Sequence, residues 1–96
     1  MASVSLAVSN CGGTATATVT LSSDERYDSN VQQPVKLKVT CGSTVHGPWD
    51  MQKVSSNPDK WEKDLSSHSF SGNCEFRTTV YYVAEDTVED WKDKTC

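Results

Sequence analysis

The last quarter of the chain, Cys74 to Cys96, carries the strongest strand signal in the sequence. Residues 76–83 bring β-branched and aromatic side chains together, and the polar run 84–87 supplies turn chemistry. A hairpin centred on this turn pairs residues whose numbers sum to about 170, which is the sum for Cys74 and Cys96. We therefore expect these two cysteines to close the open end of one hairpin.

The four cysteines, Cys11, Cys41, Cys74 and Cys96, are widely spaced and even in number. They form no CxxC pair, and the two histidines do not fall at zinc-finger spacing, so we expect no metal and no other cofactor. An even count in a short chain rich in Ser and Thr instead indicates two disulfides and an oxidising compartment. Three pairings exist. The expected strands favour Cys11–Cys41 with Cys74–Cys96, because each pair then lies at matching strand ends.

The length and composition indicate a single disulfide-stapled β domain, residues 1–96, with a modest core. Isoleucine is absent and leucine occurs only four times, too few for a helical bundle. About seven short strand signals are separated by turn signals every 8–12 residues. The expected fold is therefore all-β, a small antiparallel β-sandwich.

Alternating patterns place the expected strands. Ser3–Ser9 and Thr14–Leu21 read as a hairpin around a Gly-Gly turn, and Val35–Cys41 follows as the third strand of a meander. A short strand is expected around 50–54, and Trp61–Leu65 suits an edge strand with its tryptophan in the core. The sequence thus predicts which residues are extended and which of their faces are apolar.

The intervening stretch 22–33 is polar and poor in apolar residues. It holds Asp24, Glu25 and Asp28, but no glycine-centred ligand loop accompanies them, as a calcium site would require. We interpret it as a solvated acidic loop.

Charge and hydropathy exclude several classes of function. A net charge of −4 argues against a nucleic-acid partner, and no segment is long and apolar enough for a membrane span. The first residues lack the basic and apolar regions of a signal peptide, so Met1 is interpreted as an expression start before a mature secreted chain. We expect an extracellular monomer.

Two groups of residues could form a binding site. On the C-terminal hairpin, Arg77, Tyr81 and Trp91 share one face. They form either a cross-strand aromatic pair that covers the sheet and stacks on Arg77, or an exposed platform for a flat ligand such as a sugar ring. Trp49, next to Gly47-Pro48, is either a lid over the end of the core or an exposed binding residue.

The order of landmarks from residue 35 onward resembles starch-binding-type carbohydrate-binding modules. VKLKV is followed by GPWD, a strand opened by Trp, CEFRTTVYYV and finally EDWKD. The resemblance covers about the last 60 residues and implies a β-sandwich. It also implies that Trp49 and Trp91 stack on a sugar, with Asp50, Asp90 and Lys92 as hydrogen-bonding neighbours. The four cysteines, the Cys11-Gly12-Gly13 hairpin and the long gap between Gly42 and Trp61 depart from the family pattern.

Catalysis is not expected. His46 and His68, with Glu75 and Arg77, could suggest a small ribonuclease, but no cluster of cations accompanies them and both histidines lie in polar loop contexts. The sequence predicts a secreted, non-catalytic binding module for carbohydrate, with a site at Trp49, Asp50, Arg77, Tyr81 and Trp91. The alternative is a secreted effector, toxin or inhibitor that binds a host or competitor protein.

Overall fold

The computed structural model describes residues 3–20, 35–56, 59–83 and 86–96. The predicted acidic loop with Asp24, Glu25 and Asp28 lies outside the described residues, as do residues 84 and 85 of the predicted turn.

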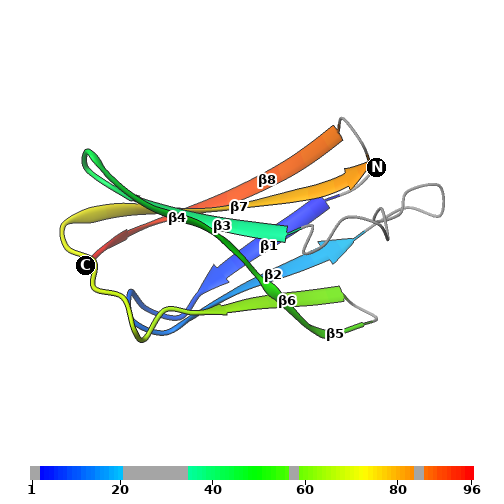
Figure 1. Ribbon diagram of the computed structural model, residues 1–96, viewed down its shortest axis with the longest axis horizontal. Helices are drawn as coiled ribbons and strands as arrows, with labels where there is room; N and C mark the ends of the chain where they lie inside the picture. The colour runs from blue at the N-terminus through cyan, green and yellow to red at the C-terminus, as the bar shows by residue number, and fades with distance from the viewer. Residues whose placement is uncertain (1–2, 21–34, 57–58, 84–85) are drawn as a thin grey trace.

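Eight strands in the described part of the chain form two antiparallel sheets, which Figure 1 shows as two layers. Sheet A contains, in spatial order, β1 (Ser3–Val8), β2 (Thr14–Thr20), β6 (Asp59–Asp64) and β5 (Gln52–Ser55). Sheet B contains β4 (Thr44–Asp50), β3 (Val35–Cys41), β7 (Asn73–Val83) and β8 (Asp86–Thr95). The predicted all-β antiparallel sandwich is confirmed, with eight strands instead of about seven.

The strand order is that of a Greek-key sandwich. Lettered along the chain, sheet A reads A-B-E-D and sheet B reads C′-C-F-G, the order found in immunoglobulin-type sandwiches. Antibody domains join strands B and F by a disulfide, whereas the cysteines here lie at other positions. Because sandwiches of this order serve unrelated functions, the order assigns none.

Side chains of the inner faces of both sheets meet in one core. Leu6, Val19, Leu37 and Phe76 are at most 2% exposed, and Trp61 is 6% exposed, as predicted for a core residue. Polar groups in this core are satisfied, because the buried Thr78 hydroxyl donates to the carbonyl of Lys36 at 3.1 Å.

The predicted first hairpin is confirmed, but the meander is wrong. β1 pairs with β2 in the register Leu6 to Ala17. The next strand, β3, lies in the other sheet between β4 and β7. β6 fills the place beside β2 and separates it from β5, so β6 is an inner strand and not the predicted edge strand. Alternation in a sequence reports which face of a strand is buried, not which strand lies beside it.

One extended stretch belongs to both sheets. β4 lies at the edge of sheet B, and the chain continues through Met51 into β5 at the edge of sheet A, the diagonal crossing in Figure 1. Met51 is fully buried, and its N–H donates to the carbonyl of Val35 at 2.9 Å. The predicted strand around 50–54 thus corresponds to this crossing and to β5.

The predicted disulfide pairing is wrong, because the bonds are Cys11–Cys96 and Cys41–Cys74. β3 runs antiparallel to β7 with Cys41 directly opposite Cys74, so the end of one strand meets the start of the other. The C-terminal hairpin pairs Cys74 with Lys94, a sum of 168, which leaves Cys96 beyond the ladder and opposite Gly72. Cys96 instead bonds to Cys11 in the β1–β2 turn and links the two sheets.

The two sheets are also joined along the edges formed by β1 and β8. The Asp90 side chain points inward from β8, and its carboxylate accepts the N–H of Leu6 at 2.7 Å. Leu6 is a residue of the edge strand β1, whose outer N–H groups have no strand partner. The carboxylate therefore satisfies one edge donor and holds the sandwich closed along this side.

We expect replacement of Asp90 by Ala to destabilise the fold by about 1.5–3 kcal/mol, the range for a hydrogen bond to a charged group. Urea unfolding followed by tryptophan fluorescence measures this change. Asp93→Ala on the same strand is the matched control, because Asp93 is exposed and points to the outer side of sheet B. Equal losses in the two variants would contradict a specific role for Asp90.

The two disulfides should contribute unequally. The chain-entropy model predicts about 4–5 kcal/mol for the loop closed by Cys11–Cys96, with a separation of 85 residues, and about 4 kcal/mol for the loop of 33 residues. Paired Cys→Ser variants measured by urea unfolding test these values. Non-reducing peptide mapping should yield a fragment that joins Cys11 to Cys96, and a fragment joining Cys11 to Cys41 would contradict the structure.

Candidate functional site

The outer face of sheet B, here called the B face, collects most of the predicted site residues. Antiparallel partners on one sheet point to the same side, so the registers define the face row by row. The rows are Thr40, Glu75 and Asp93; then Lys38, Arg77 and Trp91; then Lys36, Thr79 and Glu89; and finally Tyr81 with Thr87. Strand β4 adds Val45 and Asp50 beside Thr40 and Lys36.

The hairpin register differs from the expected one by two residues. Trp91 lies opposite Arg77 and not opposite Thr79, because the pairs sum to 168 instead of 170. A shift of two residues preserves the face of every side chain, whereas a shift of one would reverse it. For this reason Arg77, Tyr81 and Trp91 share the predicted face even though the predicted register is wrong.

Arg77 is the most highly connected side chain of the B face. Its guanidinium pairs with Glu75 (Nε to Oε1, 2.9 Å) and with Glu89 (Nη1 to Oε2, 3.2 Å), and it lies 4.6 Å from the centre of the Trp91 ring. These carboxylates raise the pKa of Arg77, first through the hydrogen bond to Glu75. The same bond lowers the pKa of Glu75. The guanidinium is therefore fixed in one place under an exposed indole.

Tyr81 and Trp91 are exposed but do not form the predicted aromatic pair. Their exposed fractions are 40% and 49%. The Thr79–Glu89 row separates them, so they lie two rows apart, about 13 Å along the strands. Instead of an aromatic pair stacked on Arg77, Trp91 alone lies against this guanidinium.

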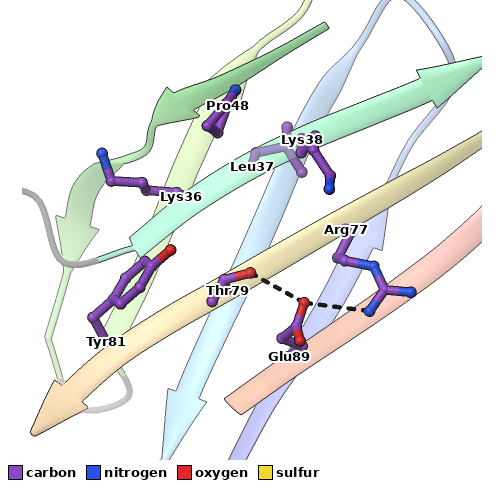
Figure 2. A pocket seen from close by; sticks show the side chains of 8 residues that line it. All are labelled: Lys36, Leu37, Lys38, Pro48, Arg77, Thr79, Tyr81 and Glu89. Atoms are coloured by element: carbon purple, nitrogen blue, oxygen red, sulfur yellow. Dashed lines mark hydrogen bonds and ion pairs between the residues drawn. The ribbon is translucent and has the colours of Figure 1, made fainter. Parts of the chain in front are cut away.

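A shallow depression of about 120 Å³ lies between Tyr81 and Arg77 on the B face. Figure 2 shows its lining, with the Thr79 hydroxyl and the Arg77 guanidinium both directed to Glu89. The remaining lining residues are Lys36, Leu37, Lys38 and Pro48. Three cations thus surround a small hollow in a chain whose net charge is −4.

Trp49 lies on the other side of the sheet. It pairs with the buried Leu37 and packs against the core, with its ring 4.5 Å from that of His68 and 5.4 Å from the Lys63 ammonium. This matches the interpretation of Trp49 as a lid over the end of the core. The three aromatic residues of the predicted platform are therefore not brought together.

A glycine fixes the local backbone beside Trp49. The cis peptide Gly47-Pro48 lies within strand β4, where the register with β3 shifts, and Gly47 has a φ of 84°. A Cβ on Gly47 would lie 2.9 Å from the N atom of Trp49 and 3.0 Å from the O atom of Leu37. Only glycine is accommodated there, and the shift presents Pro48 on the B face while Trp49 turns inward.

The polar residues that the family resemblance implies as hydrogen-bonding neighbours lie on the opposite side of the sheet from the tryptophans they adjoin in the sequence. Asp50 lies on the B face, where it pairs with Lys36 at 2.7 Å, whereas Trp49 points inward. Asp90 and Lys92 point toward sheet A and pair with each other at 3.6 Å, whereas Trp91 points outward. Consecutive residues of a strand face opposite sides, so a tryptophan and its sequence neighbours cannot share one flat site.

The two histidines occupy contexts that the sequence did not indicate. His46 lies in strand β4, half-buried, with its ring edge-on to Phe70 at 5.0 Å. His68 lies in the loop after β6, as expected, with its ring 4.5 Å from Trp49 in a tilted arrangement and stacked on Phe70 at 6.2 Å. Both histidines belong to an aromatic cluster, so neither is isolated, and His46 lies in a strand and not in the expected loop.

The sequence reasoning missed Lys36, Lys38 and Glu89 as site residues. Their outward positions could be read from alternation, but their proximity to Tyr81 depends on β3 lying beside β7. Among the described residues no group of three or more metal-ligating side chains occurs. Nor does a helix long and apolar enough to cross a membrane occur in these parts of the chain.

Comparisons with family models, curated proteins and solved structures found no match to this chain. The resemblance to starch-binding-type modules therefore stays a prediction, and the geometry of the B face is the basis for assigning a function.

Glu75 gives the B face a measurable pH dependence. Its folded pKa lies below the ordinary value of 4.5, so its stabilising contribution is fully present above about pH 4.5 and is lost as the pH falls through the folded pKa. Glu75→Gln should lower the stability at pH 7 by at most about 1 kcal/mol, and this difference should vanish near pH 2. Glu62→Gln on sheet A is the control for urea unfolding across this range, and an identical pH profile would contradict the assignment.

Proposed function

We propose that this protein is a non-catalytic binding domain that recognises a protein partner through the B face. The observation that carries the proposal is the combination on one open sheet of an exposed Trp91, the Arg77 that lies against its ring and an exposed Tyr81 two rows away. Trp, Tyr and Arg are the residue types that dominate the binding energy of protein interfaces.

The shape of the face supports a protein partner better than a small ligand. The depression holds about 120 Å³, well below the usual range of about 300–1,000 Å³ for small-molecule pockets. Around it lie cations, carboxylates, hydroxyls and aromatic rings spread over four strands. A flat surface of mixed chemistry suits the core and polar rim of a protein interface.

The internal ion pairs prepare this face for binding. Arg77 is held by Glu75 and Glu89, so little side-chain freedom remains to be lost when a partner covers it. The Trp91 ring rests on this fixed guanidinium and stays in place at 49% exposure. A pre-ordered aromatic anchor of this kind lowers the entropic cost of association.

The two disulfides support an extracellular setting for this activity, since such bonds persist in oxidising compartments. A secreted effector, toxin or inhibitor that acts by binding another protein fits these features.

The test is a binding screen against an array of secreted proteins and cell-surface ectodomains, with three forms of the protein. Wild type should bind a discrete member, and Trp91→Ala should weaken that binding by about 30-fold or more, the effect of losing an interface hot spot. Glu62→Ala, on the outer face of sheet A, should bind like wild type. Binding that survives Trp91→Ala and fails in Glu62→Ala would overturn the proposal.

Carbohydrate recognition is the second candidate, and the exposed Trp91 ring favours it. A sugar ring could stack on the face of the indole away from Arg77, without a contribution from Trp49. Iodide quenching of tryptophan fluorescence, repeated with soluble glucans and chitin oligomers, tests this candidate. Protection by one sugar that disappears in Trp91→Ala would support it, and quenching that no sugar changes would exclude it.

A further inference from the structure

The charges of the B face are sorted by strand. β3 presents two cations, Lys36 and Lys38, while β8 presents two carboxylates, Glu89 and Asp93. The strand between them, β7, carries one charge of each sign, Glu75 and Arg77. Strand β4, at the edge beside β3, adds the carboxylate of Asp50, so the β3 side keeps an excess of one cation while the β8 side is acidic.

Among the described residues, one charged side chain on each side of the B face forms no ion pair. Lys36 is paired with Asp50, and Arg77 with Glu75 and Glu89. Within the described ranges, neither Lys38 nor Asp93 has an ion pair. The cation on β3 and the carboxylate on β8 are thus available to a partner.

From this arrangement we infer that the B face binds a second copy of this chain, as a weak symmetric dimer. The inference rests on the proposed function and names one partner for the same surface. In a face-to-face dimer with its two-fold axis along β7, β3 of one copy lies over β8 of the other. The basic side then meets the acidic side twice, because each contact in a two-fold interface is repeated.

The register gives the contacts of this dimer. Lys38 shares a row with Arg77 and Trp91, so it faces the Trp91 of the second copy, beside the free Asp93 one row away. An ammonium over an indole and next to a carboxylate makes both a cation–π contact and an ion pair. Arg77 lies near the axis, where its own two carboxylates offset its charge and reduce repulsion between the copies.

The size of the face sets the strength of the association. With the axis along β7, the strands β3, β7 and β8 overlap, while β4 projects beyond β8 of the second copy. Three strands about 4.8 Å apart and about eight residues long give roughly 400 Å² per copy, or about 800 Å² in total. This area is below the roughly 1,000 Å² of a stable specific interface and corresponds to a weak, transient association. The dimer should accordingly dissociate at micromolar concentrations and leave the face open to other partners.

A charge-swap experiment tests the inference. Sedimentation velocity from about 10 µM to 1 mM should show the wild-type mass rising above the monomer value of 10.5 kDa. Lys38→Glu and Asp93→Lys should each weaken association at least tenfold, because each places like charges opposite one another. The double variant Lys38→Glu with Asp93→Lys should restore it, and so should an equimolar mixture of the two single variants.

Lys60→Glu is the matched control, because it makes the same change in net charge on sheet A. A wild-type protein that stays at 10.5 kDa at 1 mM would overturn the inference, as would a double variant that remains monomeric. Equal weakening by Lys60→Glu would show that net charge, and not the B face, controls association. A strictly monomeric protein that still binds an arrayed partner through Trp91 would refute the dimer and leave the proposed function standing.

Discussion

Burial of one side of most strands against the opposite sheet is the constraint on which the other features of this protein depend. Strands such as β2, β3 and β7 place alternate side chains in a core made largely of valine, alanine and a few larger residues. Consecutive residues of a strand then point to opposite sides of their sheet, as Trp91 and Asp90 do. The B face and the seam between the sheets are thus built from consecutive residues of one strand.

The sequence predicted strand positions and faces well because these depend on local alternation. The inward positions of β1, β2 and β3 follow from an apolar residue at every second place, such as Val35, Leu37 and Val39. The choice of neighbouring strand depends on contacts between distant segments, and nothing in the local pattern encodes it. The error in the cysteine pairing has this origin, since Cys41 meets Cys74 only because β3 leaves the first hairpin and joins β7.

The candidate site was predicted in part for the same reason. Arg77, Tyr81 and Trp91 were assigned to one face only because alternate residues of a strand point to the same side. A register error of two residues does not change this assignment. Trp49 could not be placed, because its direction depends on the register shift at Gly47 and on packing against His68. Lys36 and Lys38 occupy the outward positions of the Val35–Cys41 alternation, but their proximity to Tyr81 depends on β3 lying beside β7.

The bond between Cys11 and Cys96 also determines how the molecule responds to mechanical tension. A pulling force applied at the two ends of the chain would pass from the first strand straight through this bond to residue 96. The backbone between Cys11 and Cys96, a separation of 85 residues or about 290 Å when fully extended, would not be stretched by this force. Tension could peel β1 from β2 and break the hydrogen bond between Leu6 and Asp90, but sheet B with its outer face would remain folded.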